Sequence, residues 1–467
     1  MATTAKAGLD RSRIAELTER EQRRLNERTP ASHALYERAR TSLSGGIASS
    51  YQERDPWPIY LSHGLGSHVW DVDGNEMVDL HNGFGSMVQG HGHPAIVRAV
   101  RERVALGTHF AAPTEDAIVV SEELRRRWRL PRWRFVNSGS EATMDAIRIA
   151  RARTGRETIV KIFGSYHGHH DYVMVSIGVP YERIGDREDY RSTPYGAGIP
   201  QAVADMTVPV PFNDAGAMER RIERLFEEGR SPACVIMEPA MMNLGVVLPE
   251  PGYLEAVREL TRRLGVLLIF DEVKTGLCIA AGGATERFGV TPDLVTLAKT
   301  LGGGLPSGAI GGTEEVFEVV ENGSVYQVGT YNGNPLSIGR CAGEPARGAD
   351  ARGVRPGRGA GGADPGGLPG GARPVRAARL LGRHRRQGLR HVRPRADRRL
   401  RDVQGAPGCR TGAALLALQH EPRRVHDPGP RGGVDALGRA HGRGLRQVRR
   451  RFRGDGRGPD GLGGDDS

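Results

Sequence analysis

The sequence has few cysteines and no long apolar run, and these two scarcities exclude several classes of protein. Its four cysteines, Cys234, Cys278, Cys341 and Cys409, are widely spaced and form no CxxC pair. They indicate isolated thiols in a reducing compartment rather than a disulfide framework or a zinc site. No apolar stretch reaches the roughly 18 residues of a membrane-spanning helix. Residues 1–29 are polar and lack the apolar region of a signal peptide, so we expect a cytoplasmic protein with no membrane partner.

The last quarter of the chain lacks the residues that build a hydrophobic core. Residues 341–467 contain no Lys, Ile, Met, Asn, Tyr or Trp, and Phe452 is their only Phe. They hold 28 arginines and 28 glycines against 12 acidic residues, so their net charge is +16 and the rest of the chain, whose total is +11, carries −5. A segment of this composition cannot bury enough apolar surface to fold. We expect an Arg/Gly-rich, disordered tail, and the basic pI near 9.8 belongs to it alone.

Two interpretations of this tail are open. The residue types that it lacks use AT-rich codons, whereas Arg, Gly, Ala and Pro use GC-rich ones. This bias favours a GC-rich gene read out of frame after a join near residues 336–341. The alternative is a basic tail that binds nucleic acid. Such tails usually repeat RGG units with interleaved aromatic residues, and the absence of both disfavours a nucleic-acid partner.

Apolar strands alternate with helical stretches over the first two-thirds of the chain. This alternation predicts an α/β fold with a mainly parallel sheet covered on both faces. Ligands of such sheets bind beyond the carboxyl ends of the strands. Residues 69–80 predict a hairpin around Asp73-Gly74. We expect helices over residues 10–28, from the turn after 134 to about 153, and 253–264, and strands over 158–163, 233–238, 266–270 and 294–298.

Two charged residues stand at the ends of apolar runs and point to one chemistry. Lys299 ends the run Thr291-Pro-Asp-Leu-Val-Thr-Leu-Ala-Lys, and the glycine-rich turn 302–304 follows it. Asp271 ends the run 266–270. A buried lysine loses charge and becomes nucleophilic. It can form a Schiff base with pyridoxal 5′-phosphate, while an aspartate keeps the pyridine nitrogen of that cofactor protonated.

Three further motifs lie at strand ends. The segment Asn137-Ser-Gly-Ser-Glu-Ala leads from a strand into a helix whose free N–H groups suit a phosphate, although an ordinary capping turn looks similar. Tyr166 offers a ring for stacking, or is a core tyrosine. Glu238 is a buried carboxylate that needs a partner. The five histidines His91, His93, His167, His169 and His170 match no recurrent ligand spacing, so we expect no metal site.

Together these segments resemble the class III pyridoxal-phosphate-dependent aminotransferase family, and within it the glutamate-1-semialdehyde aminomutases. The resemblance covers about residues 30–338, and jointly its motifs are specific. It implies the fold of the aspartate aminotransferase-like, pyridoxal-phosphate-dependent transferases, catalysis of amino-group transfer and a homodimer. The motifs that carry it are Gly90-His-Gly-His-Pro-Ala-Ile, Asn137-Ser-Gly-Ser-Glu-Ala, Tyr166-His-Gly-His-His-Asp, Glu238-Pro, Asn243-Leu-Gly-Val-Val, Phe270-Asp-Glu-Val-Lys-Thr-Gly, Phe288-Gly-Val-Thr-Pro-Asp-Leu and Gly329-Thr-Tyr-Asn-Gly-Asn-Pro.

The resemblance also assigns roles to residues. Lys299 is implied to be the Schiff-base lysine and proton carrier, and Asp271 the partner of the pyridine nitrogen. Tyr166 and Val273 are implied to contact the two faces of the ring, and Thr330 of the partner subunit to help hold the phosphate. The loop from about 176 to 206 resembles the mobile active-site loop of the family. The other implied cofactor-binding residues are Ser138, Gly139 and Ser140, at the turn that also holds Glu141, together with His167 and Glu238.

Two departures from the family pattern limit this transfer. Where the aminomutases have an arginine for the substrate carboxylate, this chain reads Gly45-Gly-Ile-Ala-Ser-Ser-Tyr-Gln-Glu-Arg, and Arg54 is not an aligned replacement. The substrate, an amino acid or an amine, is therefore open, and so is the choice between mutase and transaminase. The tail replaces the segment that completes the small domain of the family.

The domains that we expect are an N-terminal helix and small-domain segment (1–75), a large cofactor-binding domain (76–338) and the tail (339–467). The alternatives to an active enzyme are a catalytically dead remnant and a basic-tailed nucleic-acid-binding derivative. A dinucleotide-binding enzyme is disfavoured because no GxGxxG motif opens a helix after a strand.

Overall fold

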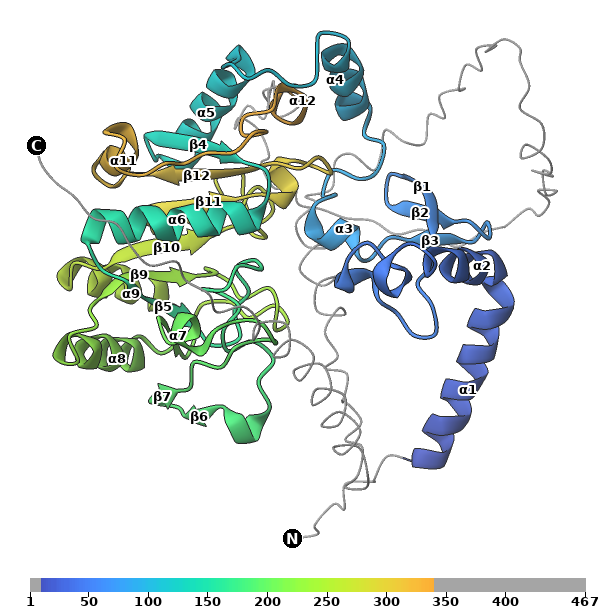
Figure 1. The fold of residues 1–467 in the computed structure, drawn as a ribbon, viewed down its shortest axis with the longest axis horizontal. Coiled ribbons are helices and arrows are strands. Elements are labelled where there is room, and N and C mark those ends of the chain that lie inside the picture. The colour runs from blue at the N-terminus through green and yellow to red at the C-terminus, as the bar shows by residue number, and fades with distance from the viewer. Residues whose placement is uncertain (1–9, 340–467) are drawn as a thin grey trace, which may run out of the picture. The chain divides into compact units, whose positions relative to one another are not determined.

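A seven-stranded sheet forms the centre of residues 10–339, the part of the chain that this computed structural model describes (Figure 1). Its spatial order is β4-β12-β11-β10-β9-β5-β8. Neighbouring strands are parallel except where β12 pairs with β11 and with β4. The predicted α/β fold with a mainly parallel sheet is confirmed. The strands are β4 (Arg132–Val136), β5 (Thr158–Ile162), β8 (Thr207–Val210), β9 (Pro232–Met237), β10 (Leu267–Asp271), β11 (Leu294–Leu297) and β12 (Gly308–Gly312).

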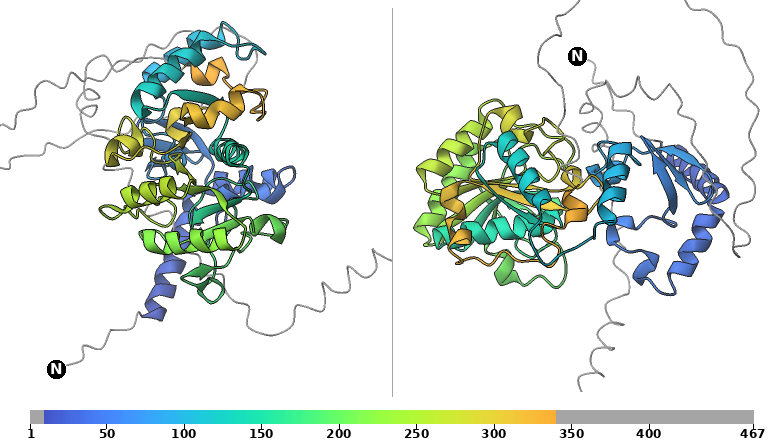
Figure 2. Two further views of the ribbon diagram at one scale, coloured as in Figure 1. Left: turned by 90° about the vertical axis from the view of Figure 1, so that its left-hand side faces the viewer. Right: turned by 90° about the horizontal axis from the view of Figure 1, so that it is seen from above.

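Helices cover both faces of this sheet (Figure 2). On one face, α6 and α11 share a core cluster with the sheet; on the other face, α5, α8, α9, α10 and α12 share a second cluster. The predicted helix that follows the turn after 134 and runs to about 153 corresponds to α6, and the predicted helix over 253–264 corresponds to α9. The helices are α5 (Glu115–Trp128), α6 (Gly139–Thr154), α8 (Ala215–Glu227), α9 (Tyr253–Arg263), α10 (Gly283–Phe288), α11 (Glu314–Glu321) and α12 (Pro335–Ile338).

Side chains alternate between the two clusters along each central strand. In β10, Leu268 and Phe270 belong to the cluster of α5, α8 and α9, whereas Ile269 belongs to the cluster of α6. Because successive strand residues point to opposite faces, Asp271 lies on the α6 face and Glu272 on the other. The same alternation brings Lys161 of β5 to the α6 face. Asp271 and Lys161 thus lie on the face covered by α6, and Glu272 lies on the opposite face.

The N-terminal part contains two helices and a three-stranded antiparallel sheet, β1-β2-β3. The predicted helix over 10–28 corresponds to α1 (Arg11–Arg28), and the predicted hairpin joins β2 (His68–Asp71) to β3 (Glu76–Val78). In the turn of that hairpin, Asp73 accepts hydrogen bonds from the N–H groups of Ala31 (2.6 Å) and Ser32 (3.0 Å). This contact fixes the start of α2 and satisfies two of its unpaired donors. The remaining elements are α2 (Pro30–Ala39), β1 (Leu61–Leu65), α3 (Asn82–Gly85), α4 (Pro94–Val104) and the 3₁₀ turns η1 (Ser44–Gly46) and η2 (Ser50–Gln52).

The loop between β5 and β8 carries short elements of its own. They are η3 (Tyr181–Arg183), β6 (Gly185–Asp186), β7 (Asp189–Tyr190) and α7 (Gln201–Ala204). A further 3₁₀ turn, η4 (Lys299–Leu301), follows β11. No helix within residues 10–339 is long and apolar enough to cross a membrane. The expectations for the Arg/Gly-rich tail lie outside the described residues.

Candidate active site

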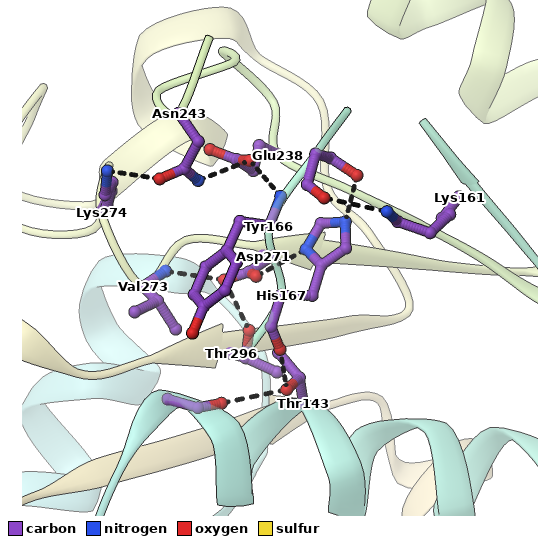
Figure 3. Close-up of polar contacts among 12 residues, drawn as sticks. Thr143, Lys161, Tyr166, His167, Glu238, Asn243, Asp271, Val273, Lys274 and Thr296 are labelled. Atoms are coloured by element: carbon purple, nitrogen blue, oxygen red, sulfur yellow. Dashed lines mark hydrogen bonds and ion pairs between the residues drawn. The ribbon is translucent and has the colours of Figure 1, made fainter. Parts of the chain in front are cut away.

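Polar side chains from four neighbouring strands meet on the α6 face at the carboxyl edge of the sheet (Figure 3). Strand β5 supplies Lys161, and β10 ends on Asp271. Thr296 lies near the end of β11 and pairs in register with Asp271. Glu238 follows β9 directly. All four are at most 4% exposed, and polar groups buried to this degree need partners.

Asp271 is held by three donors. Its Oδ2 lies 2.7 Å from Nδ1 of His167, a side chain that is also buried. Its Oδ1 accepts hydrogen bonds from the N–H of Val273 (3.0 Å) and the hydroxyl of Thr296 (3.2 Å). Because a carboxylate only accepts, His167 donates from Nδ1. The carboxylate is therefore fixed in direction at the end of its strand.

Lys299 begins η4, directly after Ala298, with a backbone φ of 47°. A positive φ is rare outside glycine, and such backbone strain is typical of functional sites. Desolvation lowers the pKa of Lys299, although the charges of Asp271 and Glu238 oppose this. Within residues 10–339, Nζ of Lys299 has no hydrogen bond or ion pair. The amine therefore lies near the two carboxylates, whose charges act on its pKa, and no described residue holds it by a hydrogen bond.

A second lysine lies close to Lys299. Nζ of Lys274 donates to Oδ1 of Asn243 at 2.7 Å, and the amide of Asn243 donates to Oε1 of Glu238 at 3.0 Å. Desolvation lowers the pKa of Lys274 to about 8, and repulsion by Lys299 adds to this effect. Neither Lys274 nor Asn243 was among the site residues predicted from the sequence. Only its position directly after Val273, within the Phe270–Gly276 motif, indicated Lys274.

The start of α6 leaves two backbone donors free. Ser138 caps the helix by accepting from the N–H of Glu141 at 3.2 Å, and the carboxylate of Glu141 accepts from the N–H of Asn137 at 2.7 Å. The N–H groups of Gly139 and Ser140 precede the first intrahelical bond, and no acceptor for either is found among the described residues. Free N–H groups and the helix dipole together favour an anion here.

Two glycines let backbone segments approach this helix start closely. A Cβ on Gly139 would lie 2.8 Å from Cγ1 of Val273, and one on Gly168 would lie 2.6 Å from Oγ of Ser140. Gly168 also has a φ of +103°, which L side chains rarely adopt. Close packing thus joins the start of α6, the Tyr166–Gly168 turn and Val273. A larger residue at position 139 or 168 would push these segments apart.

Nine of the ten predicted cofactor-binding residues lie together at the carboxyl edge of the sheet. Hydrogen bonds and packing join eight of them, and the ninth, Lys299, lies near Asp271 and Glu238, whose charges act on its pKa. The N–H of Tyr166 donates to Oε1 of Glu238 at 3.1 Å, which joins the tyrosine turn to β9. Thr330 is the exception: it is exposed in a turn, and no contact to the other nine is found among the described residues. The nine are Ser138, Gly139, Ser140, Tyr166, His167, Glu238, Asp271, Val273 and Lys299.

The neighbouring histidines belong to hydrogen-bond networks. Nδ1 of His169 lies 2.8 Å from Oγ of Ser140, and Nε2 of His170 lies 3.2 Å from Oγ1 of Thr143. Burial lowers the pKa of His170 to about 3, so this side chain is neutral. No group of three or more metal-ligating side chains is found within residues 10–339.

A family model described as aminotransferase class III matches residues 49–342. The chain belongs to the class III aminotransferases. It is 44% identical over 309 residues to the glutamate-1-semialdehyde 2,1-aminomutase of Methanocaldococcus jannaschii, which covers 66% of this chain and 70% of that protein. An omega-transaminase from Sphaerobacter thermophilus is 41% identical, with a TM-score of 0.64 over 67% of this chain and 72% of that one.

A solved glutamate-1-semialdehyde-aminomutase from Pseudomonas aeruginosa PAO1, in complex with PMP, is 30% identical. Its TM-score is 0.64, and the match covers 72% of this chain and 74% of that one. Class III aminotransferases transfer amino groups with pyridoxal 5′-phosphate as their cofactor. The family, the enzyme class and the cofactor that we predicted from the sequence are thus confirmed.

On the other face of the sheet, this class III aminotransferase buries a further carboxyl group, that of Glu272. Its side chain is 0% exposed and accepts from Nε1 of Trp128 (2.9 Å), the N–H of Ala284 (2.6 Å) and the hydroxyl of Thr275 (3.2 Å). Burial raises its pKa from 4.5 to about 7, and the hydrogen bond from Ala284 opposes this rise. Glu272 joins the segment after β10 to the start of α10.

We expect Glu272 to make the stability of the chain depend on pH. A carboxyl group with a raised folded-state pKa binds its proton more tightly in the folded chain. Its contribution to the free energy of unfolding is therefore fully present below pH 4.5. This contribution decreases by about 3 kcal/mol in total as the pH rises through 7. Urea unfolding of the cofactor-free chain from pH 5 to 8 measures this slope, and Glu272→Gln should flatten it.

The matched control is Glu259→Gln, which changes an exposed glutamate of α9. This variant should keep the slope of the unmodified chain. The same slope in the Glu272→Gln chain would contradict the assignment.

Proposed function

We propose that Lys299 and Asp271 are the catalytic pair of this aminotransferase. The observation that carries the proposal is their position at the carboxyl ends of the adjacent parallel strands β11 and β10. When bound, pyridoxal phosphate links covalently to an amine and withdraws electrons from the carbon that carries it. Asp271 stabilises the positive charge of a protonated ring nitrogen, and His167 keeps the Asp271 carboxylate oriented. Burial lowers the pKa of Lys299 and so favours the uncharged, nucleophilic form of its Nζ.

The residues around this pair support binding of the same cofactor. The N–H groups of Gly139 and Ser140 and the hydroxyls of Ser138 and Ser140 form a phosphate site at the positive end of α6. Tyr166 and Val273 would contact the two faces of the cofactor ring. Glu238 holds the Tyr166 backbone. Nζ of Lys299 would remove the proton from the carbon that carries the transferred amino group and return a proton as acid.

The proposed reaction is transamination between an amino acid or amine and a separate carbonyl compound. Where the aminomutases carry an arginine, this chain has the segment 45–54, whose Tyr51 ring lies 6.2 Å from the Tyr166 ring. The guanidinium of Arg54 donates to the backbone carbonyl of Tyr51 at 3.1 Å. Intramolecular transfer, as in the glutamate-1-semialdehyde aminomutases, is the second candidate because of the 44% identity to a protein of that name.

A homodimer in the cytoplasm is part of this proposal. The exposed Thr330 lies among side chains that are apolar and largely exposed, namely Tyr326 (79%), Val328 (74%) and Tyr331 (59%). Burial of such a patch against a second copy would be favourable. In that arrangement, Thr330 would add a hydroxyl to the phosphate site of the partner subunit.

Amino-transfer assays distinguish the two reactions. The purified full chain with pyridoxal phosphate is offered panels of amines and amino acids, each with and without an oxo acid. Transamination predicts loss of the donor and amination of the oxo acid in equal amounts. Conversion of glutamate-1-semialdehyde with no second carbonyl substrate would favour the mutase. Failure of both, together with no change in the cofactor spectrum on adding donors, would contradict the proposed function.

A further inference from the structure

Lys161 is buried completely and has no role in the reaction described above. It lies in β5 on the α6 face, and its side chain is 0% exposed. A lysine is seldom buried to this degree unless it is paired, because removing an ammonium ion from water costs several kcal/mol. No carboxylate lies within ion-pair distance of its Nζ in the described part of the chain. Another interaction must therefore stabilise it.

The partners of Lys161 are two backbone carbonyls. Nζ donates to the carbonyl of Ser165 at 2.9 Å and to that of Val175 at 2.7 Å. Burial lowers the pKa of Lys161 to about 7, while the charge of Glu238 opposes this shift. Two acceptors suit the two N–H groups of a neutral amine. The amine therefore links the turn after β5 to the segment that contains Val175.

Lys161 and Glu238 hold the same peptide group from opposite sides (Figure 3). The peptide between Ser165 and Tyr166 presents its carbonyl to Nζ of Lys161, and its N–H donates to Oε1 of Glu238 at 3.1 Å. Glu238 is held in turn by the N–H of Met242 (2.9 Å) and the amide of Asn243 (3.0 Å). A donor and a carboxylate at the two ends of one peptide polarise it and strengthen both bonds.

The orientation of this peptide determines the direction of the side chains that follow it. Tyr166 comes directly after it. Oγ of Ser165 lies 2.8 Å from Nε2 of His167, whose Nδ1 contacts Asp271 at 2.7 Å. The carbonyl of His167 is held by the hydroxyl of Thr143 at 2.5 Å. A change at Lys161 therefore reaches Asp271 through two covalently adjacent residues.

We propose that Lys161 is a positioning residue of the cofactor site. With Glu238, it fixes the Ser165–Tyr166 peptide and so aims the Tyr166 ring and the His167–Asp271 pair. The inference rests on the proposed function for its consequence at the cofactor, but the geometry of the turn is testable without the cofactor. A lysine that served only to fill the core would contribute to stability and leave the turn unchanged.

The test compares Lys161→Met with Val160→Ala in the full chain. Methionine keeps most of the volume but removes the donor, and it leaves two buried carbonyls with one partner fewer. Val160 is the neighbouring strand residue, is 0% exposed and belongs to the opposite core cluster, so its truncation loosens β5 without touching the turn. Hydrogen exchange in the cofactor-free chain, measured by mass spectrometry over residues 163–168, reads out the turn.

We expect faster exchange of this segment in Lys161→Met than in Val160→Ala. With pyridoxal phosphate, we expect Lys161→Met to have a dissociation constant about tenfold higher and a weaker visible circular dichroism of the bound cofactor. If the methionine variant does not fold, Lys161→Leu, which also removes the donor but fills less volume, carries the same comparison. Lys161 variants that match Val160→Ala in exchange, affinity and dichroism would overturn the proposal.

A double variant tests whether Lys161 and Glu238 act together on one peptide or independently of each other. Lys161→Met and Glu238→Gln both act on one peptide, so their effects on the dissociation constant should not add. Fully additive effects would overturn the peptide-bridged arrangement. If the unmodified chain fails to bind pyridoxal phosphate, the proposed function fails, whereas the exchange comparison still decides the role of Lys161.

Discussion

Replacing Lys299 by alanine should abolish the visible absorption band of covalently bound pyridoxal phosphate and lower amino transfer about 1,000-fold or more. The variant loses both the nucleophilic amine and the group that moves the proton. No other described lysine is equally placed, because Nζ of Lys274 donates to Asn243 and that of Lys161 to backbone carbonyls. An absorption spectrum and a single-turnover assay measure the two losses.

Chemical trapping identifies the reacting amine directly. The chain contains only four lysines, Lys6, Lys161, Lys274 and Lys299. Borohydride reduction of the cofactor-loaded chain, followed by peptide mass mapping, should place the label on the peptide that contains Lys299. The Lys274→Met chain should still be labelled there. A label on Lys274 would mean that the lysine with the pKa near 8, rather than Lys299, is the nucleophile.

Replacing Asp271 by asparagine should slow amino transfer about 100- to 1,000-fold while covalent cofactor binding persists. The amide keeps the shape of the side chain and its Oδ1 acceptor for Val273 and Thr296. It cannot supply the negative charge that stabilises a protonated ring nitrogen, and it no longer suits the Nδ1 donor of His167. Single-turnover rates with an amine donor, set against the dissociation constant of the cofactor, separate the two effects.

Asp293→Asn is the matched control for this change. Asp293 lies at the opposite end of β11, where it accepts from both terminal nitrogens of Arg258 (2.6 and 2.7 Å) and from the N–H of Leu268 (2.8 Å). Loss of this pair should lower the free energy of unfolding and leave the single-turnover rate unchanged. A rate loss in Asp293→Asn as large as in Asp271→Asn would show that the effect is not specific to the cofactor site.

Local sequence patterns predicted those helices and strands whose secondary structure depends mainly on their own residues. The apolar runs before Asp271 and Lys299 predicted buried strands with charged ends, and β10 and β11 agree with them. The strand β12 was not predicted, since its sequence is Gly-Ala-Ile-Gly-Gly and glycine has low strand propensity. Its place between β4 and β11 requires small residues: a Cβ on Gly311 would meet the ring of Trp133 at 2.5 Å.

The strand β8 was missed for a related reason. It contains Pro209, which counts against a strand assignment within a sheet. The sheet order puts β8 at the edge beside β5, where a missing N–H need not be paired. Only the assembled sheet distinguishes an edge position from a central one.

The sequence by itself determined the family and the cofactor and predicted the chemically reactive residues, because these depend on residue types next to short apolar runs and turns. The tertiary structure alone decided which of these residues touch. Tyr166 meets Glu238 across 72 positions, and His167 meets Asp271 across 104. Such contacts follow from the order of strands in the sheet, and the local periodicity of apolar residues does not encode that order. The same holds for Lys161, whose importance comes from two backbone carbonyls that it reaches only after β5 and the turn beyond it have folded.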